Sequence, residues 1–440
     1  MKIQKLIVLV LVLAMVLSLG AFPALADEPA AENVIFICDG AEGDGSSAES
    51  PLKPTTGNYV EEGSRPERDQ DAALYQAWQK LMAVGGGTIV ICGPYTLNNK
   101  NCQPIGGASA DFLMPIEQHN NDITITYTSV WDGVDYRETN GAELILAGKS
   151  HLTFPTTTVI QELTIRGTDD NVDHYLCGGM HPLSLLHGTN LIPYEEGSVD
   201  TYPMIVGGFR NNNVGFKEGD SHILIDIGDE NYVGNVFGIG NGGNGKHNGN
   251  SNITIKSGNI GGVYGDSRCV SQVPINGKIT IRFEGGIYRG LIAGVNVGFG
   301  GPCDKTIDVI VTGGDFTNCL GIQVHTTAAD AVLPEAVIVD CTNAPAETAA
   351  QVSNVCASGV TLKMPEMPTE PPTEPEADPT EPEANPTEPE ADPTEPSADL
   401  PGDPGADPAP APNNIWIYIV VAVAVAAVVV VVVVVAKKKK

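Results

Sequence analysis

The chain of 440 residues has few basic side chains, because 24 Lys and Arg stand against 54 Asp and Glu, a formal net charge of −30 at pH 7. Six of the lysines are Lys2, Lys5 and residues 437–440, so the region between them carries 18 basic against 54 acidic residues. Such a surface repels DNA and RNA unless metal ions bridge the charges. The composition therefore excludes nucleic acid as a partner and favours neutral glycans or protein surfaces.

No C-x-x-C pair occurs among the nine cysteines, which leaves a zinc site with little support. An odd number of cysteines also excludes complete pairing within the chain. Cys38 and Cys92 end the similar strings IFIC and IVIC, which predicts stacked neighbours, and we expect inward-facing free thiols that pack as small apolar groups. Cys269 and Cys303 each precede a strand and are better candidates for a bridge between loops.

No helical pattern separates the short apolar-polar-apolar triplets that recur along the middle of the chain. The intervals between triplets are 26 to 30 residues, and turns rich in glycine follow them. The triplets occupy residues 223–225, 253–255, 279–281, 309–311 and 337–339. Leucine-rich repeats need a Leu spacing that is missing here, and propeller blades run roughly 40 to 50 residues. The period therefore predicts stacked units of another kind, each with at least two short strands.

The triplets predict parallel strands. Alternation places Ile253 and Ile255 on one face of a strand and Thr254 on the other. Successive copies run in the same direction, so they pair only as parallel strands, and the rest of each unit is the crossover. A coil that stacks about 4.8 Å above itself is a parallel β-helix with inward columns of Ile and Val. We expect Ile253, Ile279 and Val309 to occupy equivalent inward positions in consecutive coils.

Residues 1–26 have the pattern of a secretory signal peptide. Lys2 and Lys5 precede an apolar run over residues 6–22, and the small-residue sequence 24–26 (ALA) stands just before polar Asp27. An uncleaved anchor is the alternative, but the cleavage pattern favours a mature protein that begins near Asp27.

A single amphipathic helix is expected over residues 71–84, where apolar residues recur at helical spacing. Asp69 or Asp71 is placed to cap its start, and residues 85–87 (GGG) end it. A helix before a solenoid is suited to covering the open end of the core.

Residues 39–45 are acidic and rich in glycine, as Ca²⁺-binding loops are, but their spacing does not match such a loop. We therefore expect an ordinary solvated turn there.

The helix and the following GGGTIVICGPYTL (residues 85–97) resemble the opening of right-handed β-helix proteins of the pectin-lyase-like superfamily. Residues 122–148 and the later ITIKSG, ITIRFEGG and VIVTGG units resemble β-helix surface proteins of Gram-positive bacteria. The resemblance covers roughly residues 33–362. It implies an all-β, right-handed parallel β-helix with a short N-terminal capping helix, and it says little about function because one fold supports many chemistries.

The resemblance also implies motifs that enzymes of this superfamily use, and most are missing. Polygalacturonases carry NTD, DD, GHG and RIK strings, of which only Asp169-Asp170 is present. Residues 186–188 (LHG) lack the first glycine, and residues 164–167 (TIRG) are not RIK. Two carboxylates from different coils, for instance Asp226 and Glu284, remain an alternative glycosidase pair, since hydrolysis needs only two acids at a suitable distance.

Four potential ligands gather where the repeat is hard to follow, at Asp169, Asp170, Asp173 and His174. Oxygen ligands of this kind hold Ca²⁺, which could bridge to a polysaccharide carboxylate. A solvated acidic loop explains the same residues. The solvated loop is the favoured interpretation, and Asp169, Asp170 and Asp173 are kept as the metal candidates of the alternative, with Ca²⁺ as the ion and no cofactor required.

The C-terminal part is not globular in composition. Residues 363–414 contain the repeats PTEPEAD, PTEPEAN and PTEPSAD, which offer almost nothing apolar to bury and one sign of charge, so they predict a disordered, extended stalk. At about 3.1 Å per residue, roughly 50 residues reach on the order of 150 Å.

Residues 415–436 form an uninterrupted apolar stretch, long enough to span a bilayer as a helix, with basic residues 437–440 on the cytoplasmic side. The arrangement resembles a Gram-positive sorting signal, but the LPxTG pentapeptide is missing and residues 400–404 (LPGDP) match it poorly. We therefore expect a retained single-pass anchor rather than covalent attachment to the wall.

Together these features predict a β-helix domain over residues 27–362, displayed at the cell surface by a stalk and a membrane anchor. Non-catalytic adhesion or glycan binding is the favoured function, with an extracellular glycan or a surface protein of a host or neighbouring cell as the partner. A polysaccharide lyase or glycoside hydrolase is the alternative. The number of copies in the functional protein is left open.

The predicted topology is tested by adding protease to intact cells. Because the stalk is extended and exposed, cleavage should release a fragment that ends in the acidic repeat, detected by mass spectrometry of the medium. Protection of the β-helix combined with access to residues 437–440 would show that the orientation is reversed.

Overall fold

The computed structural model describes residues 33–54, 72–97, 110–112, 114, 116–147, 150–168, 174–195, 201–209, 219–240, 249–265, 277–295, 306–325 and 336–366. All of them belong to one compact unit, residues 1–369, and a second unit, residues 370–440, lies outside the described residues. The predicted signal peptide, the stalk beyond residue 366 and the apolar span 415–436 lie outside as well. Among the described residues no helix is both long enough and apolar enough to cross a membrane.

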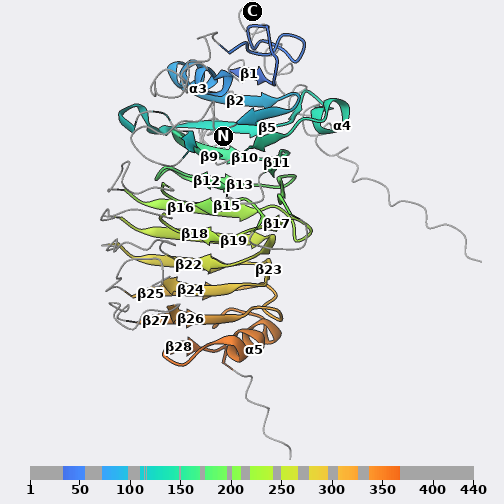
Figure 1. The fold of residues 1–440 in the computed structure, drawn as a ribbon. Coiled ribbons are helices and arrows are strands. Elements are labelled where there is room, and N and C mark those ends of the chain that lie inside the picture. Colours follow the sequence, from blue (N-terminus) through green and yellow to red (C-terminus); the bar gives the residue numbers. More distant parts are fainter. Residues whose placement is uncertain are drawn as a thin grey trace, which may run out of the picture. The chain divides into compact units, whose positions relative to one another are not determined.

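The described chain is mostly β-structure, wound so that successive coils add strands to three sides, and the coils stack from α3 to α5 (Figure 1). One side is a parallel sheet of eleven strands, called the long sheet here. In spatial order it contains β1 (Val34–Ile37), β2 (Gly86–Ile91), β5 (Asn120–Thr128), β10 (Thr156–Ile160), β13 (Leu183–Leu185), β16 (Ser221–Asp226), β19 (Ser251–Ser257), β22 (Ile279–Phe283), β25 (Ile307–Val311), β27 (Val337–Asp340) and β28 (Val360–Lys363).

The other two sides are also parallel. The eight-stranded sheet contains β4 (Ala110–Phe112), β9 (Ser150–Thr153), β12 (Tyr175–Cys177), β15 (Met204–Val206), β18 (Val236–Phe237), β21 (Val263–Tyr264), β24 (Leu291–Val295) and β26 (Gly321–His325). The third side has two shorter sheets, made of β3 (Tyr95–Leu97), β8 (Leu144–Leu146), β11 (Thr164–Gly167) and β14 (Asn190–Ile192), then of β17 (Tyr232–Val233), β20 (Asn259–Ile260) and β23 (Ile287–Tyr288). The order of the strands confirms the predicted parallel β-solenoid.

The core of the solenoid is built from columns of aliphatic side chains, as the alternation predicts. In the long sheet Ile223 pairs with Ile253, Ile253 with Ile281, Ile281 with Val309, and Val309 with Val339. Each of these five residues is at most 3% exposed. Burial of one such side chain contributes about 1.5–3 kcal/mol, and each rung repeats the contribution.

The predicted register is wrong at two rungs, because Ile281 rather than Ile279, and Val339 rather than Val337, occupy the positions equivalent to Ile253 and Val309. Ile279 faces inward as expected, but it pairs with Ser251 and Ile307, two residues away from the position equivalent to Ile253 and Val309. The inward residue at that level is Ile281, so the steps between equivalent positions are 30, 28, 28 and 30 residues. Side chains in a strand alternate with a period of two, so a slip of two residues keeps every apolar residue inward and cannot be detected from the triplets.

Glycines form the corners because neighbouring coils approach too closely for a side chain. Gly314 has φ of 109°, in the left-handed region that favours glycine, and it follows β25 in the turn that the sequence marks as GG. At the corner after the eight-stranded sheet, a Cβ on Gly238 would lie 2.3 Å from the carbonyl oxygen of Gly265 in the next coil. Any larger residue at Gly238 would force two coils apart.

The first rung is closed by α3 (Ala73–Ala83) and by residues 43–52. Phe36 N donates to Gly45 O at 2.9 Å and Leu52 N donates to Phe36 O at 2.8 Å, which pairs the outer edge of β1. Residues of α3 on the core side, among them Ala77 and Trp78, are fully buried. The predicted capping helix is therefore present, and it covers the open end of the core.

The predicted side-chain cap of α3 is wrong. Its N-cap is Ala72, which has no side chain able to accept a hydrogen bond, rather than Asp69 or Asp71. The free backbone N–H of Leu74 instead donates to the phenolic oxygen of Tyr95 at 3.0 Å. A tertiary contact thus satisfies a group that a local cap normally satisfies.

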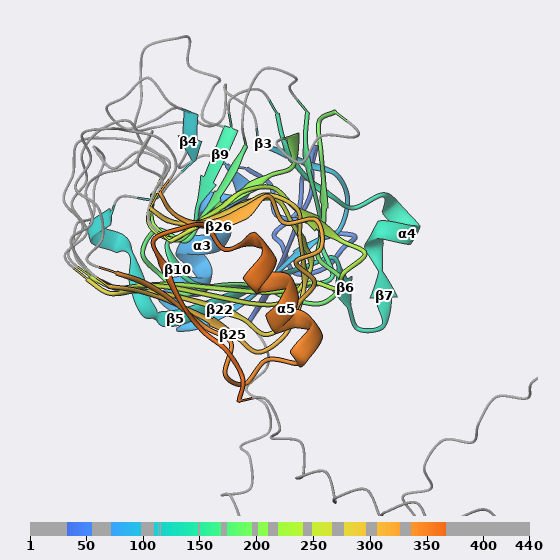
Figure 2. The same ribbon diagram turned by 90° about the horizontal axis from the view of Figure 1, so that it is seen from below.

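The last rung is closed by α5 (Ala346–Val355), which lies across the end of the solenoid in the view along its length (Figure 2). Gln351 Oε1 accepts from Phe316 N at 2.9 Å, and Thr348 Oγ1 donates to Gly314 O at 3.1 Å. Ala357 N then donates to Ile322 O at 2.8 Å. These bonds satisfy backbone groups at the end of the solenoid that would otherwise pair with a further coil.

An excursion leaves the solenoid after β5. It consists of the hairpin β6 (Val130–Trp131) and β7 (Val134–Asp135) followed by α4 (Tyr136–Asn140), and it projects to the side in Figure 2. Arg137 anchors it, because its guanidinium contacts the carboxylates of Asp135 and Glu162, each at 2.6 Å, and donates to Gly188 O at 2.8 Å. The short helix η1 (Ile116–Gln118) precedes β5.

Cys38 and Cys92 are stacked neighbours as predicted, but they do not face inward. Ile37 pairs with Ile91, which places the two cysteines opposite each other one residue later. Both belong to a small apolar cluster on the outer face of the long sheet, separate from the main core. This cap cluster consists of Phe36, Val90 and Cys92, with Val34, Cys38, Ala48, Trp131 and Tyr136 packed against them.

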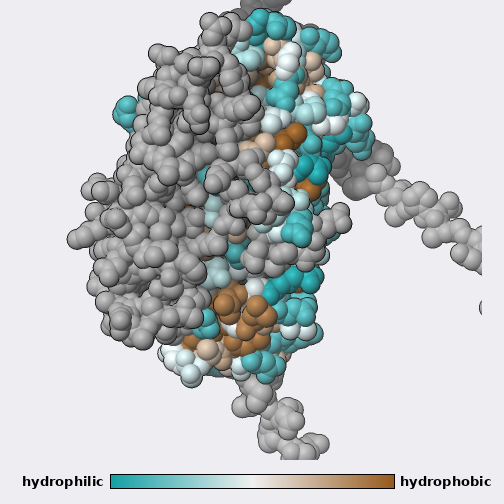
Figure 3. Space-filling model, in the orientation of Figure 1, coloured by the Kyte–Doolittle hydropathy of each residue, from teal (hydrophilic) through white to brown (hydrophobic). Residues whose placement is uncertain are grey.

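The eight-stranded sheet buries both of its faces in its middle part. All three residues of β12 and of β15 are buried, and a second cluster, separate from the main core, contains Tyr175, Cys177, Met204, Val206 and Phe237. Phe237 stacks on Tyr264 of the next coil, with ring centroids 5.0 Å apart. Figure 3 shows mostly hydrophilic residues on the coloured part of the viewed surface, with an apolar patch in its lower part.

Replacing Ile281 by Asn is expected to destabilise the domain by at least about 3 kcal/mol, because an aliphatic side chain is lost from a packed column and an amide is buried without partners. The matched control is Thr280→Asn, one residue away on the outer face, which should cost less than about 1 kcal/mol. Urea unfolding of both variants measures the difference. Equal losses at the two positions would contradict the inward and outward assignment.

Candidate functional site

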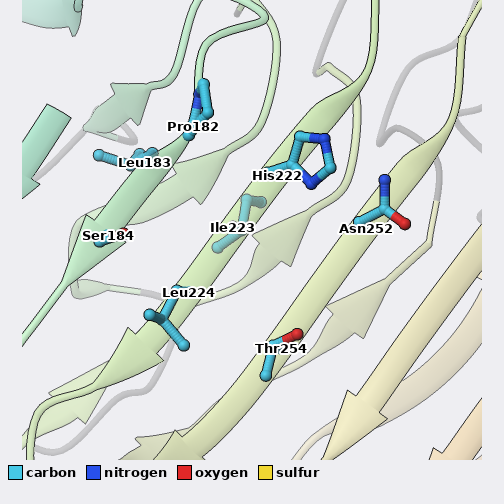
Figure 4. A pocket seen from close by; sticks show the side chains of 8 residues that line it. All are labelled: Pro182, Leu183, Ser184, His222, Ile223, Leu224, Asn252 and Thr254. Carbon is cyan, nitrogen blue, oxygen red and sulfur yellow. The ribbon is translucent and has the colours of Figure 1, made fainter. Parts of the chain in front are cut away.

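A shallow groove of about 220 Å³ lies on the outer face of the long sheet, across β13, β16 and β19. It is lined by Pro182, Leu183, Ser184, His222, Ile223, Leu224, Asn252 and Thr254 (Figure 4). The register explains its composition, since Ser184, Leu224 and Thr254 lie side by side on consecutive rungs and His222 lies beside Asn252. The strand alternation that points Ile223 into the core also points His222 and Leu224 outward.

The groove combines a mainly aliphatic surface with a few polar groups, and it carries no carboxylate, Lys or Arg among its lining residues. Hydroxyl groups come from Ser184 and Thr254, an exposed imidazole from His222 and an amide from Asn252. Asn252 Nδ2 donates to Ser221 O at 3.3 Å, which orients the amide along the groove. Leu224 and Pro182 add aliphatic surface between these polar groups.

Two imidazoles meet at the corner that leads into the groove. His119 Nδ1 lies 2.9 Å from His181 Nε2, and His119 Nε2 donates to Met114 O at 2.9 Å. His181 Nδ1 contacts the side-chain amide of Asn121, and the ring of Phe209 stacks on His119 with centroids 6.0 Å apart. His181 directly precedes Pro182, so the pair adjoins the groove lining.

Burial keeps this imidazole pair neutral. It lowers the pKa of His181 to about 3, with the neighbouring His119 as a smaller cause. The pKa of His119 is lowered as well, chiefly by burial, while the bond to Met114 O and the charge of Glu117 act in the opposite direction. Since Met114 O only accepts, neutral His119 carries its proton on Nε2, and its Nδ1 accepts from His181 Nε2–H.

The predicted metal candidates Asp169, Asp170 and Asp173 lie outside the described residues, so the Ca²⁺ site stays a prediction. His174, from the same stretch, is 1% exposed and packs edge-on to Tyr194, with ring centroids 6.3 Å apart. Among the residues that the structure describes, no group of three or more His, Cys, Asp or Glu side chains is arranged to hold a metal ion.

The acidic loop at residues 39–45 is a hydrogen-bonded turn, as predicted. Asp39 accepts from the backbone and hydroxyl of Thr96, at 3.1 and 2.7 Å. Asp44 accepts from Ser46 and Ser50, and these bonds lower its pKa to about 2. The oxygens that a cation would need are thus engaged by hydroxyl and amide donors.

The structure does not bring Asp226 and Glu284 together on neighbouring rungs. Asp226 is on β16 and pairs with Ser257 of β19, whose hydroxyl donates to its carboxylate at 2.8 Å. Glu284 follows β22, one rung further, so two rung spacings, about 9.6 Å, separate the two backbones. The other enzyme-like strings are structural, because Arg166 Nε pairs with Glu143 at 2.9 Å and Gly188 O accepts from Arg137.

The groove residues and the imidazole pair were missed at the sequence level. A usable signal existed for the groove, since His222, Leu224, Asn252 and Thr254 are the outward partners of the predicted inward residues. No comparable signal existed for the pair, whose two members are 62 residues apart in the sequence. Comparison of the chain with protein-family models, curated proteins and solved structures found no match.

Acid is expected to destabilise the domain through the imidazole pair. The folded-state pKa values of His119 and His181 are lowered, so below about pH 6.5 the unfolded chain binds more protons, and stability falls as pH drops toward 3. Each imidazole contributes a slope of at most about 1.4 kcal/mol per pH unit.

Urea unfolding between pH 7 and 4 measures this slope. His181→Gln should flatten it, whereas His222→Gln, an exposed imidazole in the groove, is the control that should follow the wild type. An unchanged slope in His181→Gln would show that other groups cause the acid sensitivity.

Proposed function

We propose that this chain is a non-catalytic surface protein that binds a neutral glycan in the groove across β13, β16 and β19. The observation that carries the proposal is the composition of the groove: two hydroxyls, an imidazole and an amide beside aliphatic surface, with no charged lining residue. Sugar hydroxyls pair with neutral donors and acceptors, while the C–H faces of a pyranose pack on side chains such as Leu224. A charged substrate would require paired charges that this lining lacks.

The regular rungs support a ligand that is itself a repeating chain. Polar outward residues recur beyond the groove, because Asn252 pairs with Thr280 and Thr280 with Asp308. Rungs are spaced by about 4.8 Å, close to the length of one hexose unit. An oligosaccharide laid across the strands would therefore meet equivalent positions on consecutive rungs.

The proposal extends to fold family and location. The solenoid is a right-handed parallel β-helix of the pectin-lyase-like kind, supported by the strong preference of parallel crossovers for the right-handed sense. It is displayed outside a Gram-positive cell by the acidic stalk and a span at residues 415–436, supported by the composition of both segments. Its partner is an extracellular glycan, or a glycosylated surface protein of a host or neighbouring cell, and Ca²⁺ is a candidate accessory ion at Asp169, Asp170 and Asp173.

A glycan array with residues 27–362, run with and without Ca²⁺, tests the binding proposal. Asn252→Ala is expected to weaken binding of a captured neutral glycan by about 2- to 10-fold, the effect of one lost hydrogen bond. Combining it with His222→Ala should give roughly the product of the two single effects. Thr361→Ala, exposed on β28 at the far end of the same sheet, is the matched control.

The same samples are assayed for new reducing ends and for unsaturated products. Saturable binding without product supports the proposal. Binding that ignores both groove variants would place the site elsewhere, and turnover abolished by Asp169→Asn or Asp170→Asn would replace binding by a lyase or hydrolase activity.

A further inference from the structure

The two thiols of the cap cluster face each other across the first pair of rungs. Cys92 N donates to Ile37 O at 3.1 Å and Asp39 N donates to Pro94 O at 2.8 Å, so backbone bonds hold the strands together on both sides of the cysteine pair. Adjacent strands are about 4.8 Å apart, within the range of Cα separations that a disulfide spans. Cys92 Sγ donates to Ile37 O at 3.5 Å, and both cysteines are free thiols.

No other described cysteine has this arrangement. Cys177 pairs with Thr153 on one side and Val206 on the other. Cys356 lies opposite Ile322, and the Cys341 backbone N–H donates to Lys363 O. Only the register of β1 and β2 places two described cysteines at facing positions on neighbouring strands.

The surroundings protect one thiol and leave the other accessible. Cys92 is 3% exposed beneath the excursion that carries Trp131 and Tyr136, and burial raises its pKa to about 12. Cys38 is half-buried, and its pKa is also raised, mainly by burial. Attack on an external disulfide therefore begins at Cys38, the thiol that solvent and a reagent can reach.

We propose that Cys38 and Cys92 are a disulfide site, oxidised by a thiol-disulfide oxidoreductase or by oxidised glutathione. The Cys38 sulfur loses its proton and attacks one sulfur of the external disulfide, which breaks that S–S bond and releases one thiolate. Cys92 then loses its proton and attacks Cys38 sulfur, which releases the second thiolate. One S–S bond forms and one breaks, and two electrons and two protons leave on the two external thiols.

The bond would tie the end rung to the first complete coil. It closes a loop from residue 38 to residue 92, which contains both residues 43–52 and α3, the two elements that close this end of the core. Cross-linking this loop restricts the unfolded chain and also prevents β1 from separating from β2. With the bond in place, β1 cannot separate from the end of the solenoid unless the first complete coil, which contains β2, also unfolds.

The direct test is made on the full chain, without a variant. The folded protein is incubated with oxidised glutathione, alkylated without reduction, digested and analysed by mass spectrometry. A cross-linked peptide pair containing Cys38 and Cys92, lighter by two hydrogens than the two free peptides together, is expected. Alkylation of both residues, or pairing of either one with a different cysteine, would overturn the proposal.

Stability gives a second measurement. Reduction should lower the unfolding temperature of the oxidised wild type by about 5 °C, as expected for a native disulfide. Cys38→Ser, at the half-exposed position, should show no such response, whereas the control Cys341→Ser should keep it. A response that persists in Cys38→Ser would assign the redox effect to other cysteines and contradict the proposal.

Discussion

The structure depends on one constraint, which is that each rung hydrogen-bonds to the next at the spacing of a parallel β-sheet. Each residue therefore has its counterpart from the adjacent coil about 4.8 Å away, so equivalent residues of successive coils form a column. The side chains of one column must fit against one another, not only against their own coil. Inward columns take aliphatic residues such as Ile253 and Ile281. Corner columns take glycine where a neighbouring carbonyl lies too close, as at Gly238. Outward columns are free to vary, and the groove occupies part of one such surface.

The sequence alone predicts the sheet and its faces from β16 to β27, because apolar alternation recurs there at steps of 28 or 30 residues. It does not predict the register, since Ile279 and Ile281 both alternate correctly and only the pairing of whole strands decides between them. It also misplaces Cys38 and Cys92. The strings IFIC and IVIC are apolar throughout because both faces are covered at this end, inward by the core and outward by the cap cluster, and alternation carries no information there.

The site is harder to predict than the fold for the same physical reason. Ser184, His222 and Asn252 are ordinary polar residues on the outer face, and they form a groove only because the register places their three strands side by side. The imidazole pair needs two segments 62 residues apart to be in place before its 2.9 Å contact exists. Motif comparison works from residues close in sequence, so it draws attention to Asp169-Asp170, which lies outside the described residues, and passes over side chains that meet between coils.

The closed ends limit how such a protein can change its length during evolution. Residues 43–52 and α3 fit one end, and α5 fits the other through Gln351 and Thr348, so a coil added beyond either cap would meet no complementary edge. An insertion or deletion of a whole interior coil of 28 or 30 residues, between β16 and β25, leaves both caps and every column intact. Variants of this architecture should therefore differ by whole rungs, and their outer surface should lengthen or shorten in increments of about 4.8 Å.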